Sequence, residues 1–309
     1  VPTEAYFFED PALYDDFNRT EDTSPLAENS SSLSEASAGT NADDTIDKSS
    51  ETNSVTINGL DGDDTIIGGT NDDIINGGNG RDSITGKAGN DILSGGTGND
   101  TIHGNNGNDK IMGDEGDDVL KGGDGNDVIV GGVGDDVLSG NNGDDIFYYK
   151  PNDVDGSSKD IIQDFGDGNN SIVASQAPTS AYNRKKIHTD ATQIGSNYDI
   201  TTNSNELPYV FNFTYDVPTA TADNSAGIAN HLSGFSIGVS ATGASLATDE
   251  SMYITIGDGT DTYIYFWTDT NNHHGMIAES ELDPVVRLSN FNNDNLDGSE
   301  FSFQTISGV

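Results

Sequence analysis

The chain has 309 residues, carries 53 acidic against 12 basic side chains, and has a formal net charge of −41 at pH 7. A surface this acidic repels nucleic acid and anionic membranes, so neither is expected as a partner. The sequence contains no apolar run of about eighteen residues, which excludes a membrane-spanning helix, and no cysteine, which excludes disulfides and thiolate metal sites. The length allows two domains.

Residues 1–58 are expected to form an acidic, serine-rich arm that contains too few apolar residues to build a core of its own. Any order in the arm must therefore come from a surface that it covers, on this chain or on a neighbouring copy. Residues 42–47 resemble one degenerate copy of the repeat that follows, and residues 55–58 resemble a strand. The chain starts at Val1 without a signal pattern, so we expect a processed form or an excised fragment. The arm opens with an aromatic cluster, Tyr6, Phe7, Phe8, Tyr14 and Phe17.

Residues 59–148 repeat one nine-residue unit ten times in unbroken register, in the pattern G-x-x-G-x-D-x-U-x, where U is a large apolar residue. The sixth position is always aspartate: Asp64, Asp73, Asp82, Asp91, Asp100, Asp109, Asp118, Asp127, Asp136 and Asp145. The eighth position is always apolar: Ile66, Ile75, Ile84, Leu93, Ile102, Ile111, Leu120, Ile129, Leu138 and Phe147.

A period of nine is incompatible with an amphipathic helix, in which apolar residues recur every three or four positions. It is compatible with a coil, because glycine-rich loops can turn the chain and three residues around the apolar one can form a short strand. Two units then close one turn of eighteen residues, and successive turns stack at about 4.8 Å. The ten aspartates fall into two columns, one along each edge of the stack. Stacked carboxylates need cations.

The repeat is similar to that of the RTX family, whose nonapeptide GGxGxDxUx is a signature of a calcium-binding parallel β-roll. The resemblance implies that each calcium is held between neighbouring turns by the ten aspartates and by loop carbonyls, oxygen ligands that suit Ca²⁺. Four gaps in each column predict about eight ions, whose charge nearly cancels the net −15 of residues 59–148. Without calcium, we expect disorder. Leu60 and Lys87 stand where a second glycine is usual, and neither suits a left-handed backbone.

The outward positions of the roll differ between its two faces. One face presents threonine and serine with two valines, one histidine and one lysine, and the other is expected to expose a more apolar column. An exposed apolar column usually marks a contact with another domain or molecule, although scattered surface aliphatics without a role are the alternative. The more apolar face comprises Ile74, Ile92, Lys110, Val128 and Ile146 with Met112, Val130 and Tyr148.

Residues 149–309 are expected to form a β-rich C-terminal domain. Its first segment, residues 159–172, resembles an element that closes many RTX rolls. Two alternating runs, residues 253–256 and 263–267, are joined by a glycine-rich turn and predict a strand pair. The last stretch, residues 285–303, resembles the region through which RTX proteins leave the cell by type I secretion. The predicted fold is therefore all-β: a right-handed parallel β-roll of about five turns, followed by this domain.

No catalytic residue is expected. Ser236 lies in a GxSxG pattern, but the alternation of Phe235 and Ile237 around it places the serine on the outer side of a strand and not at a nucleophile elbow. The HExxH motif of zinc proteases is absent from the sequence. Residues 268–282 faintly resemble an EF-hand loop, but threonine and histidine at its ligand positions favour a relic loop. A regular threonine ladder for ice binding is also missing.

The sequence thus favours an extracellular, calcium-dependent structural or adhesive protein, a subunit of a filament, surface layer or adhesin that binds copies of itself through the arm. One alternative is the non-catalytic end of a secreted lipase, protease or polysaccharide epimerase. The other is a carbohydrate-binding domain in contact with a cell surface or polysaccharide, in which an exposed platform of Tyr263, Tyr265 and Trp267 stacks on sugars. An upstream catalytic domain would distinguish the first alternative.

Overall fold

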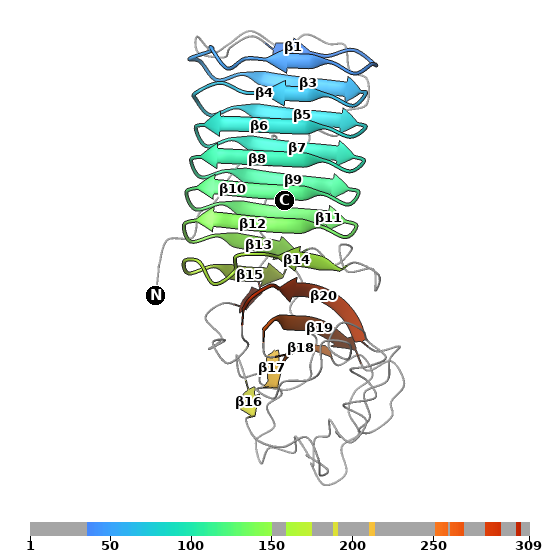
Figure 1. Ribbon diagram of the computed structural model, residues 1–309, viewed down its shortest axis with the longest axis vertical. Helices are drawn as coiled ribbons and strands as arrows, with labels where there is room; N and C mark the ends of the chain where they lie inside the picture. The colour runs from blue at the N-terminus through green and yellow to red at the C-terminus, as the bar shows by residue number, and fades with distance from the viewer. Residues whose placement is uncertain are drawn as a thin grey trace.

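The computed structural model describes residues 36–149, 159–174, 188–190, 210–213, 251–258, 260–268, 282–291 and 301–303. Every regular element in these residues is a strand, which confirms the predicted all-β class. None of these described residues belongs to a helix that is long and apolar enough to cross a membrane. The strands stack in one column, and a second group of strands continues beneath it (Figure 1).

Two sheets form the column and the group beneath it. The nine-stranded sheet contains, in spatial order, β1 (Ala36–Ala38), β3 (Thr56–Asp61), β5 (Ile74–Asn79), β7 (Ile92–Thr97), β9 (Lys110–Glu115), β11 (Val128–Val133), β13 (Ile146–Tyr149), β15 (Ser171–Ala174) and β21 (Phe301–Phe303). The twelve-stranded sheet contains β16 (His188–Asp190), β17 (Val210–Phe213), β18 (Ser251–Gly257), β19 (Thr262–Thr268), β20 (Leu282–Leu288), β14 (Asp160–Ile162), β12 (Val137–Asn142), β10 (Val119–Asp124), β8 (Thr101–Asn106), β6 (Ser83–Ala88), β4 (Thr65–Ile67) and β2 (Thr45–Asp47).

The register of the strands confirms the predicted turn of eighteen residues. Neighbouring strands in the repeats are parallel, and Ile92 in β7 pairs with Lys110 in β9, which in turn pairs with Val128 in β11. Stacking also continues outside the ten repeats, through β1 and β2 at one end and β14 and β15 at the other. The result is a parallel solenoid of about six turns.

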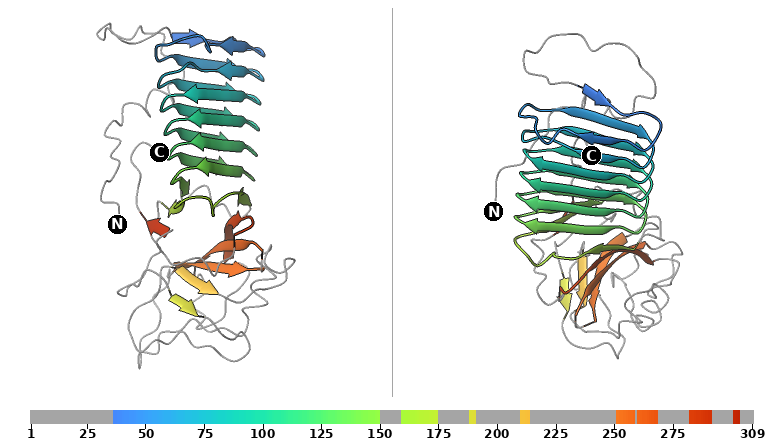
Figure 2. Two further views of the ribbon diagram at one scale, coloured as in Figure 1. Left: turned by 60° about the vertical axis from the view of Figure 1, so that its left-hand side comes forward. Right: turned by 45° about the horizontal axis from the view of Figure 1, so that its top comes forward.

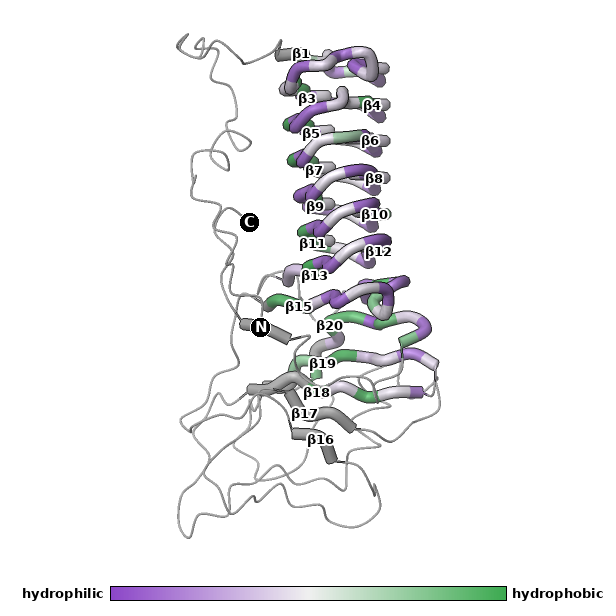
Figure 3. Tube along the Cα trace, turned by 90° about the vertical axis from the view of Figure 1, so that its left-hand side faces the viewer, coloured by the Kyte–Doolittle hydropathy of each residue, from purple (hydrophilic) through white to green (hydrophobic). Residues whose placement is uncertain are grey.

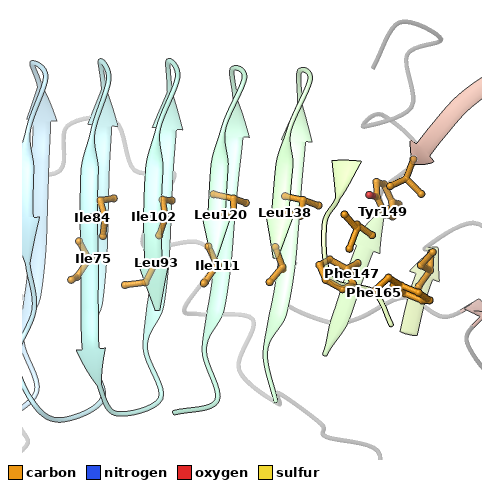
Figure 4. Close-up of a cluster of buried hydrophobic side chains, with 14 of the residues drawn as sticks. Ile75, Ile84, Leu93, Ile102, Ile111, Leu120, Leu138, Phe147, Tyr149 and Phe165 are labelled. Carbon is orange, nitrogen blue, oxygen red and sulfur yellow. The ribbon is translucent and has the colours of Figure 1, made fainter. Parts of the chain in front are cut away.

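The eighth position of each unit forms the core of the roll, as the period predicts. These side chains point inward from both sheets and face one another in two rows along the stack (Figure 4). All ten are at most 1% exposed to solvent. The packing continues past the repeats, because the Phe147 ring lies 6.1 Å from that of Phe165, which packs edge-on against Phe291 at 5.2 Å. The core therefore does not end with the last repeat.

The C-terminal strands close the lower end of the roll. Strand β20 pairs in parallel with β14, so the last turn of the roll and the C-terminal strands share one sheet (Figure 2). Strands β18 and β19 form the predicted antiparallel pair, and β19 also pairs with β20. Ile264, Val286 and Leu288 belong to the same buried cluster as the repeat core. The two parts therefore form a continuous hydrophobic body.

An ion pair between Asp261 and Arg287 links two of the C-terminal strands. The Asp261 side chain is 5% exposed, and one of its oxygens accepts a 2.8 Å hydrogen bond from Arg287 Nε and a second bond from the Arg287 guanidinium. Its other oxygen accepts a 2.7 Å bond from the Asn290 main-chain nitrogen. The Asp261 carboxylate therefore joins the start of β19 to the end of β20.

The apolar outer face of the nine-stranded sheet was expected to be exposed, but its central side chains are buried. Met112, Val130, Tyr148 and Val173 point away from the core of the roll, yet they form a second buried cluster and are at most 4% exposed. Met112 pairs directly with Val130, and Tyr148 with Val173, so these side chains are in-register neighbours on adjacent strands. Ile92 and Ile146 pack against this cluster and are partly buried.

Two loop residues adopt the left-handed backbone that the sequence analysis identified as unfavourable for them. The φ angle is 82° at Leu60 and 89° at Lys87. A side chain in this region costs about 1–2 kcal/mol per residue, part of which is offset because glycine has more freedom in the unfolded chain. Both positions therefore carry local strain.

Replacing Lys87 by glycine should raise the free energy of unfolding of the calcium-loaded protein by up to about 1 kcal/mol. The matched control is Gly96→Lys at the same position of the next unit, where φ is 109° and a Cβ would lie 2.0 Å from the Gly78 carbonyl oxygen. This control should be destabilising. Thermal unfolding at saturating calcium measures both, and a Lys87→Gly protein less stable than the parent would contradict the assignment of strain.

Candidate metal sites

The ten predicted aspartates line the two edges of the roll, where the loops connect the sheets. Figure 3 shows hydrophilic residues along these loops and apolar residues on the strands. All ten aspartate side chains are buried, with at most 2% of their surface exposed. Carboxylates at this depth need hydrogen bonds or a cation, because an isolated charge is costly to bury.

One oxygen of each carboxylate holds the neighbouring turn in register. The Asp82 main-chain nitrogen donates to Asp100 Oδ1 at 2.7 Å, and the Asp100 nitrogen donates to Asp118 Oδ1 at the same distance. The opposite edge repeats the pattern, with Asp91 donating to Asp109 Oδ1 at 2.8 Å. Each aspartate therefore caps the turn before it, and the structure brings the predicted aspartates into two continuous columns.

The second carboxylate oxygen, Oδ2, is buried without a hydrogen-bond donor in eight of these aspartates. In each unit this oxygen faces the first glycine of its own loop: a Cβ on Gly95 would lie 2.2 Å from Asp100 Oδ2 and 2.9 Å from the Gly113 carbonyl oxygen of the next turn. Two oxygens thus converge over a glycine without a proton donor between them. The eight residues are Asp64, Asp82, Asp91, Asp100, Asp109, Asp118, Asp127 and Asp145.

Main-chain carbonyls offer further oxygen ligands near these carboxylates. The Gly78 and Gly80 carbonyl oxygens point along the stack and would lie 2.0 Å from a Cβ on Gly96 and Gly98, respectively. Within the residues that the structure describes, no group of three or more His, Asp or Glu side chains is arranged to hold a metal. A bound ion would therefore rely on few carboxylates and on carbonyls, a donor set that suits Ca²⁺.

Burial also changes the proton affinity of these carboxylates. Loss of solvation raises the pKa of Asp91, Asp100, Asp118 and Asp127 to about 7. The same cause raises the pKa of Asp109 and Asp145 to about 6. At neutral pH the buried carboxylates are therefore poorly held in the ionised form by the protein alone, and a nearby cation would favour that form.

Three residues outside the repeats extend the columns and were not predicted as site residues. The Asp44 nitrogen donates to Asp64 Oδ1 at 2.8 Å, the Asp136 nitrogen to Asp160 Oδ1 at 3.0 Å, and the Asp145 nitrogen to Asn170 Oδ1 at 2.8 Å. The signal was available: each of the three stands two residues before an apolar strand residue, as in the repeats.

A second ladder, also missed, follows the fifth position of the unit. There the side-chain oxygen accepts from the main-chain nitrogen of the next turn, as when Asp117 Oδ1 accepts from the Asp135 nitrogen at 3.0 Å. The two ladders thus run in opposite directions along the stack. The exception is Arg81, which forms an exposed 3.5 Å ion pair with Asp63. The signal is that nine of ten units carry Asn or Asp there: Asp63, Asp72, Asn90, Asn99, Asn108, Asp117, Asn126, Asp135 and Asp144.

The other sequence-derived candidates fare differently. Tyr263 and Tyr265 are 4% and 2% exposed, so they do not form the exposed sugar platform of the carbohydrate-binding hypothesis. The guanidinium of Arg287 lies 5.6 Å from the centre of the Tyr263 ring. The Trp267 side chain, Ser236, the EF-hand-like loop and the aromatic cluster of the arm lie outside the described residues.

Comparison with known proteins agrees with this geometry. No curated protein matches the sequence. The family model for the RTX calcium-binding nonapeptide repeat, in four copies, matches residues 56–84, 85–120 and 121–150. These segments contain all ten aspartates of the two columns. Residues 56–150 of this chain therefore match the RTX calcium-binding nonapeptide repeat that the sequence resembles.

Proposed function

We propose that this chain is a secreted structural or adhesive protein, without catalytic activity of its own, that folds on calcium outside the cell. The observation that carries the proposal is the repeated pair of convergent oxygens, a buried Oδ2 without a donor and a facing carbonyl. Such a stack is unfavourable without cations. Extracellular calcium modules work at about 10⁻⁴–10⁻³ M, far above cytosolic calcium, so the chain would stay unfolded until export.

The continuous core supports a role as a calcium-dependent scaffold. Because the C-terminal strands share a sheet and a core with the last turn of the roll, ordering the repeats also orders the surface on which those strands pack. The ten aspartates Asp64 to Asp145 are the proposed ligands, with about eight ions as the expected number. We infer that calcium assembles the whole body rather than the repeats alone.

The upper end of the roll offers a route to assembly. Among the described strands, β1 and β2 are the terminal strands of their sheets. Terminal strands present main-chain groups to which a further strand can add, so copies of this chain could associate there through strand addition. Residues 1–35, the part of the arm that precedes β1, lie next to this edge in the sequence. Exchange of arms between two upper ends would close a dimer, whereas an arm that reaches the opposite end of the next copy would make a head-to-tail contact and build a filament or lattice.

Size-exclusion chromatography with light scattering, in millimolar calcium and in chelator, tests folding and association together. The full chain should be expanded and monomeric in chelator, and compact and associated in calcium. A variant lacking residues 1–34 should retain the calcium-dependent compaction and lose association. If the truncated protein associates as well as the full chain, the arm is not the connector. If neither compacts with calcium, the scaffold proposal fails.

A further inference from the structure

The last loop of the stack, residues 164–170, ends in an asparagine where the repeats have aspartate. Asn170 is 4% exposed, and its Oδ1 accepts from the Asp145 main-chain nitrogen at 2.8 Å, as an aspartate does elsewhere in the column. Its second polar atom is a nitrogen. Asn170 Nδ2 lies 3.0, 3.3 and 3.4 Å from the carbonyl oxygens of Asp167, Phe165 and Asp164.

The last loop differs from the loops of the repeats at one atom, because Asn170 Nδ2 stands where a repeat aspartate has Oδ2. In the loop of Asp127, Oδ2 has no donor and lies 2.0 Å from where a Cβ on Gly122 would be, with the Gly140 carbonyl oxygen 2.8 Å from the same point. The ordinary loop thus places oxygen against oxygen. The last loop replaces one of these oxygens by an amide group with two donors, which provides partial positive charge for the loop carbonyls.

Direct hydrogen bonds also join the last loop to the loop above it. Asp164 Oδ1 and Oδ2 accept from the main-chain nitrogens of Gly140 and Asn141 at 3.1 and 2.8 Å. In addition to the Asn170 side-chain amide, this loop thus has a carboxylate, Asp164, whose two oxygens both accept hydrogen bonds from main-chain nitrogens. The gap between these two loops is held by hydrogen bonds from both sides.

In two loops at the upper end of the stack, the aspartate Oδ2 also has hydrogen-bond donors from its own loop. Asp73 Oδ2 accepts from the Gly69 nitrogen at 2.5 Å, and above Asp73 the aspartate position is occupied by Val55. Asp44 Oδ2 accepts from the Thr40 nitrogen at 2.6 Å and from the Thr40 hydroxyl at 2.9 Å. In both loops the oxygen that lacks a donor in the interior finds one within its own loop.

We propose that hydrogen bonds take the place of a cation beyond the ends of the two aspartate columns, and that the Asn170 amide substitutes for the ion in the gap below Asp145. The inference rests on the proposed calcium-dependent folding and deepens it. Calcium then binds only in the interior gaps, and the last loop keeps its form without metal. It offers a preformed end, joined to the C-terminal strands, onto which the calcium-dependent turns add.

The test is the number of calcium ions bound by the full chain, measured by equilibrium dialysis at saturating calcium. Asn170→Asp restores the repeat pattern and should bind one more ion than the parent. Asn169→Asp is the matched control, because it adds the same charge one residue away on an exposed side chain; it removes the 2.9 Å bond from Asn169 Nδ2 to Asp144 Oδ1 and keeps the 3.1 Å bond from the Asn169 main-chain nitrogen to the same oxygen. It should leave the count unchanged. Equal counts for folded Asn170→Asp and Asn169→Asp would overturn the proposal.

A second variant decides the matter if Asn170→Asp fails to fold. Asn170→Ala removes the donor without adding charge, so it should bind as many ions as the parent while the last loop loses protection from hydrogen exchange in chelator. The Ser171 amide, which donates to the Asp145 carbonyl at 2.8 Å, reports on this. A count one lower than the parent would show that the loop holds an ion. Failure of the parent to bind calcium would instead refute the proposed function.

Discussion

Replacing Asp100 by alanine should release calcium from two adjacent gaps and destabilise the calcium-loaded protein by about 3–5 kcal/mol, the range seen when one partner of a buried charged set is removed. Asp100 lies in the middle of its column, with Asp82 before it and Asp118 after it. Its loss removes ligand oxygens on both sides. It also leaves the buried Asp82 main-chain nitrogen without its acceptor, which alone costs about 1–3 kcal/mol.

Two further variants separate the metal from the hydrogen bond. Asp100→Asn keeps an oxygen for the Asp82 nitrogen but removes the charge, so it should lose calcium with a smaller loss of stability than the alanine variant. Asp117→Ala removes a neighbouring carboxylate that caps the Asp135 nitrogen from the exposed ladder. It should leave the calcium count unchanged. Calorimetric titration and thermal unfolding measure both quantities, and equal calcium losses for Asp100→Ala and Asp117→Ala would contradict the column model.

The column and the core were predictable because both follow from the period. Once two units close one turn, residues eighteen apart must be neighbours, and the sixth and eighth positions fall into line without further information. The confirmed pairing of Ile92 with Lys110 is the direct expression of this arithmetic. The ladder at the fifth position was equally periodic. It was missed because Asn and Asp were treated as variable residues, although both carry the same acceptor oxygen.

The ends of the stack were harder to predict because the period breaks there. Asp136 and Asp160 are neighbours across 24 residues, and Asp145 and Asn170 across 25, so neither pair appears at the spacing of eighteen. Residue identity was a second obstacle. Asn170 lacks the carboxylate that marks the repeat, although its side-chain amide forms hydrogen bonds to the carbonyl oxygens of the last loop. Non-local pairing has no periodic signal either. Alternation predicted β18 and β19 as strands, but not that β20 would join the roll through β14.

The pH dependence of folding should reverse when calcium is removed. In chelator, β structure should increase as the pH falls through about 7 to 5 and should be lost again as the pH rises. The cause is that burial raises the folded-state pKa of Asp91, Asp100, Asp118 and Asp127 to about 7, and that of Asp109 to about 6. The unfolded value for aspartate is about 3.9. The folded chain therefore binds more protons than the unfolded chain between these values, and protonation favours folding.

With calcium the direction is opposite, because the ions require the carboxylates in their ionised form and protons compete for the same oxygens. The calcium concentration at the midpoint of folding should therefore rise as the pH is lowered from 8 to 6. Circular dichroism across this pH range, once in chelator and once during calcium titration, measures both branches. Protons and calcium neutralise the same buried oxygens. The β signal in chelator and the calcium concentration at the midpoint of folding should therefore change over the same pH interval. A calcium-free β signal that grows with pH would show that these carboxylates are not the groups that keep the apo roll unfolded.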